Sequence, residues 1–111
     1  MSVVTNVILH MGCLDDEQGE KLLAQVNEFF DNEDRDCMGF VLVDDPSLPE
    51  GWYGGTKMLE CTLAIGAFNY LDLGDLVEHL RQIKWPRYIQ GNVQLMVKEQ
   101  DHGRFRIIDV A

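Results

Sequence analysis

Two helical patterns, each opened by an aspartate, divide this chain into alternating strand and helix segments. Asp15 is followed three positions later by Gln18, and Asp72 by Asp75, which is the spacing of a helix N-cap and its partner. Apolar residues then recur at helical spacing through both segments. Each amphipathic helix must bury its apolar face against another element, so the intervening segments are expected to supply one shared core.

The segments between the helices have the alternation and composition of strands. Five strands are expected, at residues 3–11, 38–43, 57–70, 92–98 and 104–110. Within the long third segment, Gly66 is expected to mark a bulge or bend, and one face is shared by Leu59, Cys61, Leu63, Ile65 and Ala67. The order βαββαββ predicts an α+β fold, a ferredoxin-like βαββαβ sandwich with an extra C-terminal hairpin strand. Two helices would cover one face of a mainly antiparallel sheet.

The length of 111 residues fits one domain spanning residues 1–111. No run approaches the roughly 18 to 20 apolar residues of a bilayer-spanning helix, and the first residues lack the pattern of a secretory signal. The three cysteines, Cys13, Cys37 and Cys61, are far apart and form no C-x-x-C pair, which favours a reducing compartment. We therefore expect a cytoplasmic protein with no membrane association.

Charge is distributed unevenly along the chain. The formal net charge is −10, and 12 of the 19 acidic residues lie in residues 1–50, against only two basic residues, Lys21 and Arg35. A surface of this sign repels phosphate backbones, so direct nucleic-acid binding is not expected. It would instead attract a basic partner. The alternative explanation is that the acidic charge only keeps the protein soluble.

No motif in the sequence indicates an enzyme, a cofactor or a metal site. The serines and threonines are in no recognised nucleophile turn, and the glycines of residues 51–55 match neither common nucleotide-binding pattern. Spacing from Asp34 to Asp45 imitates a calcium-binding loop in part, but an apolar strand occupies its middle. We expect a protein that is not an enzyme and has no cofactor and no metal.

The loop at residues 44–56 is the strongest candidate for a binding site. Trp52 and Tyr53 lie between glycines in this loop, and aromatic residues of this kind often supply the binding energy of protein interfaces. The opposing interpretation is that Trp52 folds back as a lid over the sheet edge or core. Acidic residues expected to steer a basic partner and form rim ion pairs are Asp31, Glu33, Asp34, Asp36, Asp44 and Asp45.

These features favour an acidic protein-interaction module that binds a basic partner protein and inhibits or neutralises it. In size and charge alone the chain resembles small acidic toxin-immunity proteins and phage-encoded inhibitors. The alternative is a small-molecule-binding or catalytic ferredoxin-like protein, dimeric through its sheet, with a ligand near His10, Tyr53 and Tyr70. A structural subunit of a larger assembly is a third possibility.

Overall fold

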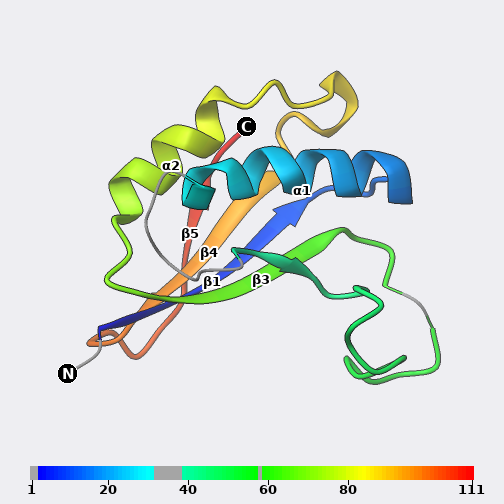
Figure 1. The fold of residues 1–111 in the computed structure, drawn as a ribbon, viewed down its shortest axis with the longest axis horizontal. Coiled ribbons are helices and arrows are strands. Elements are labelled where there is room, and N and C mark those ends of the chain that lie inside the picture. The colour runs from blue at the N-terminus through cyan, green and yellow to red at the C-terminus, as the bar shows by residue number, and fades with distance from the viewer. Residues whose placement is uncertain (1–2, 32–38, 58) are drawn as a thin grey trace.

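A computed structural model describes residues 3–31, 39–57 and 59–111 of the chain. Two helices and a five-stranded antiparallel sheet make an α+β fold, with both helices on one side of the sheet (Figure 1). In chain order the elements are β1 (Val4–Met11), α1 (Asp16–Asp31), β2 (Val41–Leu42), β3 (Leu63–Asn69), α2 (Leu73–Gln82), the 3-10 turn η1 (Arg87–Ile89), β4 (Val93–Glu99) and β5 (Arg106–Asp109). In the described part of the chain, no helix is long and apolar enough to cross a bilayer.

The strand order is β2-β3-β1-β4-β5, which places β1 at the centre of the sheet and β2 and β5 at its edges. Every neighbouring pair is antiparallel. The short edge strand β2 joins β3 through Val41 opposite Ile65 and Leu42 opposite Ala64. The C-terminal β5 forms a hairpin with β4, as expected from the sequence.

Both helices begin at the residues that the capping pattern predicts. The Asp15 carboxylate accepts a hydrogen bond from the Gln18 N–H at 2.8 Å, and Asp72 accepts one from the Asp75 N–H at 3.0 Å. These bonds satisfy backbone donors that a helix start would otherwise leave unpaired. The sequence-based prediction of two capped helices is confirmed.

The core lies between the helices and one face of the sheet. Alternate residues of the two central strands are buried there, including Val7 and Leu9 of β1 and Leu95 and Val97 of β4. At one end of this layer an aromatic cluster forms from Phe30, Phe40 and Phe68, with ring centroids 4.5 to 6.1 Å apart.

Two sequence-based expectations for residues 57–70 are wrong. The strand begins only at Leu63, because β1 ends at Met11 and β2 is two residues long. Thr62 still makes backbone hydrogen bonds to Met11 and Gly12, but residues 59–61 have no strand partner. Gly66 makes no bulge: it pairs in register with Val7, and the Phe68 ring lies where a Gly66 side chain would be. A glycine here makes room for that ring in the core.

Asn27 of α1 fixes the segment that enters β2. Its side-chain amide donates to the Phe40 carbonyl at 3.0 Å, and its side-chain oxygen accepts from the Phe40 N–H at 2.7 Å. Gly39 precedes this contact with a φ of +73°, and a side chain there would collide with Asn27. Phe40 is 1% exposed, so these backbone groups are shielded from water.

We predict that Asn27→Ala lowers the free energy of unfolding by about 1 to 3 kcal/mol, because two buried backbone groups lose their partner. Urea unfolding followed by circular dichroism measures this change. The matched control is Glu28→Ala at the adjacent exposed position, with an expected change within about 0.5 kcal/mol. Equal losses for the two variants would contradict the role of Asn27.

Candidate functional site

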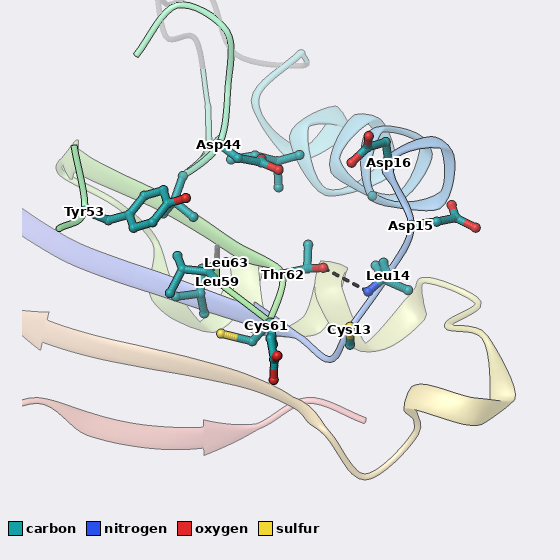
Figure 2. Close-up of a pocket in the computed structure, with 14 residues that line it drawn as sticks. Cys13, Leu14, Asp15, Asp16, Asp44, Tyr53, Leu59, Cys61, Thr62 and Leu63 are labelled. Carbon is teal, nitrogen blue, oxygen red and sulfur yellow. Dashed lines mark hydrogen bonds between the residues drawn. The ribbon is translucent and has the colours of Figure 1, made fainter. Parts of the chain in front are cut away.

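The candidate site is a cavity at the end of the sheet where β1 leads into α1. Its volume is about 210 Å³. Three segments form its wall: residues 13–19, residues 42–53 and residues 59–63 (Figure 2). We call it the acidic cavity, and it is lined by Cys13, Leu14, Asp15, Asp16, Gly19, Leu42, Val43, Asp44, Tyr53, Leu59, Glu60, Cys61, Thr62 and Leu63.

Backbone and side-chain hydrogen bonds hold two of these segments together. Thr62 donates its N–H to the Gly12 carbonyl at 2.7 Å and accepts the Met11 N–H at 2.9 Å. Its hydroxyl also accepts the Leu14 N–H at 3.0 Å, the bond drawn in Figure 2. Gly12 has a φ of +71°, which turns the chain out of β1 toward α1. These hydrogen bonds therefore hold the Thr62 side of the cavity wall against the end of the central strand β1.

The third segment is the aromatic loop predicted from the sequence. The Trp52 indole N–H donates to the Val43 carbonyl, and the rings of Trp52 and Tyr53 meet nearly edge to face with centroids 6.2 Å apart. Trp52 is nevertheless 43% exposed, whereas Tyr53 is half-buried and lines the acidic cavity. The loop thus folds Trp52 back against the residue that follows the edge strand β2, but it does not bury the ring as a lid over the core.

A second hollow adjoins the acidic cavity along this loop. Its volume is about 440 Å³, and its lining includes Asp16, Asp44, Asp45, Glu50 and Trp52. Asp16, Asp44 and Tyr53 line both spaces. Together the two linings hold six carboxylates and no lysine, arginine or histidine.

The described structure separates the acidic residues that the sequence grouped together. Asp44 and Asp45 lie beside Trp52 and Tyr53. Asp31 is at the last residue of α1, about 22 Å along the helix axis from Asp16, so it does not join them. Glu33, Asp34 and Asp36 fall outside the described residues.

The sequence predicts only a helix start for two acidic residues that line the cavity. Asp15 and Asp16 have the local pattern of a helix start, and Asp15 does cap α1. Their position beside Asp44 depends on long-range packing, which no local pattern contains. The only hint in the sequence is that both lie in the strongly acidic first half of the chain.

The three residues expected around a small-molecule ligand are not brought together. His10 pairs with Leu63 near one end of β3, whereas Tyr70 follows Asn69, which pairs with Val4 at the other end. Six residues of strand separate these pairs, or about 20 Å. Tyr53 lines the acidic cavity, but His10 and Tyr70 do not.

Two cysteines line the acidic cavity. Cys61 is half-buried on the cavity wall, and Cys13 on the same wall is exposed. Both thiols are free. Among the described residues, no three His, Cys, Asp or Glu side chains are grouped so as to hold a metal ion.

Comparison of the chain with protein-family models, curated proteins and solved structures found no match. The functional interpretation therefore depends on the chemistry of the cavity itself. Acidic residues from separate segments line the cavity together with apolar and aromatic side chains, a composition that suits an organic cation. The stem of such a group can lie against Leu59, Leu63 and Tyr53, with its charge near an acidic residue of the lining.

Ser47 adjusts the ionisation of one loop carboxylate. Its hydroxyl and its N–H both donate to the Asp45 carboxylate, and these bonds lower the pKa of Asp45 below its ordinary value. The bonds favour the charged form, so they stabilise the loop at neutral pH. Their contribution is lost as the pH falls through the lowered pKa and Asp45 becomes protonated.

We predict that Ser47→Ala raises the pKa of Asp45 toward the ordinary aspartate value, because the hydroxyl bond is removed. Titration of the Asp45 carboxyl carbon by NMR measures this directly. Ser47→Thr keeps a hydroxyl and is expected to keep the lowered pKa. An unchanged titration in the alanine variant would show that the hydroxyl does not control Asp45.

Proposed function

We propose that this protein is a non-enzymatic interaction module that binds a basic partner protein, and inhibits or neutralises it, through the acidic cavity and the adjoining loop. The observation that carries the proposal is that six acidic residues from three chain segments line the two hollows, together with two aromatic side chains and no base in either lining. A lysine or arginine side chain of the partner would enter the acidic cavity. Trp52 would contact the surface around it.

The size of the acidic cavity supports a side chain as its occupant. Its volume of about 210 Å³ is below the roughly 300 to 1,000 Å³ typical of pockets for drug-sized ligands, whereas the adjoining hollow of about 440 Å³ is within that range. The alternative function, a small-molecule-binding or catalytic protein, needs a convergent set of ligand-binding or catalytic groups. His10, Tyr53 and Tyr70, proposed for that function, are spread along the sheet.

The partner would approach along an electrostatic gradient. The acids that line the two hollows belong to a chain whose net charge is −10, so a basic protein is attracted before contact. We further propose a cytoplasmic location, which the free thiols of Cys13 and Cys61 fit.

The ferredoxin-like topology is also part of our proposal. The first four strands have the order β2-β3-β1-β4, all antiparallel, with one helix in each βαβ half on the same side of the sheet. This arrangement supports a βαββαβ sandwich to which β5 is added beside β4. Such folds carry many unrelated functions, so the topology itself says nothing about the partner.

We predict that acetyl-arginine methylamide, a mimic of one arginine in a protein, shifts the NMR amide signals of Gly19, Tyr53 and Thr62. The neutral analogue acetyl-norleucine methylamide is expected to cause much smaller shifts, because it lacks the charge. In the double variant Asp16→Asn, Asp44→Asn the arginine probe should bind at least about threefold more weakly. Equal shifts from both probes, or no loss in the variant, would contradict a cation site.

We predict that Trp52→Ala weakens the complex with the natural partner about tenfold or more, chiefly by raising the dissociation rate. Surface plasmon resonance on a partner isolated from the native source measures both rates. High salt should slow association of the wild-type protein, because its carboxylates are screened. Tyr88→Ala, which removes an exposed aromatic residue far from the loop in sequence, is the control. A complex insensitive to both Trp52→Ala and salt would exclude this surface.

A further inference from the structure

The side of the sheet opposite the helices carries a continuous apolar row. Strand alternation directs Ile8 away from the buried face of β1, and the register places Ile65 and Met96 directly beside it. Val41 pairs with Ile65, and Ile107 pairs with Met96. One apolar side chain from each of the five strands thus forms a line across the sheet: Val41, Ile65, Ile8, Met96 and Ile107. We call this surface the open face.

No described helix covers the open face, since α1 and α2 both lie on the other side (Figure 1). The contrast is clearest in β5, where Ile108 packs against the core while its neighbour Ile107 is 62% exposed. A contiguous apolar strip of this kind on a folded domain commonly marks an interaction surface.

Charge on the open face differs from that of the whole molecule. The described strand positions that point to it carry one acid, Asp109, and one base, Lys98, whereas the chain as a whole has a net charge of −10. Two copies of so acidic a protein repel each other over most of their surfaces. The open face is a surface on which two copies can meet without adding local repulsion between like charges at the contact.

The register also makes the open face self-complementary. Lys98 belongs to the row that contains Asn6, on one side of the apolar row, and Asp109 belongs to the row that contains His10 and Gln94, on the other side. A two-fold axis running along the apolar row exchanges these flanking rows between copies. Lys98 of each copy then lies over the row that holds Asp109 of the other copy, so the same ion pair forms twice.

The area is near the lower limit for a stable dimer. Five strands about 4.8 Å apart, three of seven or eight residues and the edge strands of two and four, cover somewhat less than roughly 20 by 25 Å in projection. Side chains that project from the face add to this area, which brings it toward the roughly 600 Å² per partner at the low end of standard interfaces.

We propose that this protein forms a two-fold symmetric homodimer by packing the open faces of two sheets against each other. Ile8 and Met96 lie at the centre of this interface, and Lys98 and Asp109 flank it. Face-to-face packing of sheets buries apolar rows of this kind in many β-sandwiches. The proposal does not depend on the function of the acidic cavity: Leu63 belongs to both surfaces, but the apolar row and the flanking ion pair of the dimer do not include it.

The test is the mass of the protein in solution, measured by light scattering and sedimentation at micromolar concentration. The wild-type chain is expected at twice its monomer mass of 12.7 kDa. Ile107→Glu should raise the dimer dissociation constant at least about a hundredfold, because two unpaired carboxylates would lose water at the interface. Ile107 is exposed on an edge strand, so the variant should keep the wild-type circular dichroism and urea midpoint.

Tyr88→Glu is the matched control. It places the same charge at an equally exposed apolar residue on η1, away from the strands, and should leave the dimer intact. In a second test, Lys98→Glu and Asp109→Lys should each weaken the dimer, and the double exchange should restore part of the loss. A monomeric wild-type protein would overturn the proposal. The open face would then be a candidate surface for binding a different protein. Equal dissociation by Ile107→Glu and Tyr88→Glu, or no effect of Ile107→Glu, would also overturn it.

Discussion

The pairing of β1 with strands on both sides is the interaction on which the remaining structure depends. Seven residues of β1 are in register with β3 and seven with β4, so its backbone lies at the middle of the sheet. Because successive side chains of a strand point to opposite faces, this one strand has two different tasks. Val7, Leu9 and Met11 form the floor beneath the helices, while Ile8 is the centre of the open face.

The end of β1 also determines where the candidate site lies. After Met11 the chain turns at Gly12 and is held by Thr62 before α1 begins. The same hydrogen bonds draw residues 59–63 against the start of α1, and the loop after β2 completes the wall. A change at Thr62 would therefore move both the helix start and the cavity.

Local signals in the sequence predict the parts of this fold that local interactions stabilise. Asp15 and Asp72 identify both helix starts because a cap and its partner are only three residues apart. The prediction of a single strand over residues 57–70 is wrong for the opposite reason. A strand requires a neighbouring backbone, and the apolar alternation around Cys61 continues past the point where β1 and β2 end. Alternation likewise groups Leu63 with Ile65, but it does not say which side the helices cover.

The same distinction explains what could be predicted of the site. Trp52 and Tyr53 stand out in the sequence because they are aromatic residues in a glycine-rich loop, a local property. The approach of Asp16 to Asp44, across 28 residues of chain, depends on how α1 lies over the sheet. Asp31 is close in sequence to other acidic residues, but it does not lie at the cavity. It is the last residue of α1, and the cavity is at the first turn of that helix.

The placement of the two proposed surfaces has a consequence for recognition. The acidic cavity lies beside β2 and the start of α1, whereas the open face extends across the sheet to β5 at the other edge. A homodimer built on the open face would carry two acidic cavities. A partner with two suitably spaced basic sites could then bind both at once, and the second contact would form at high effective concentration. Weak binding of one arginine at each cavity is compatible with a tight complex on this basis. Conversely, a monomer would need Trp52 and the rim carboxylates to supply nearly all of the affinity.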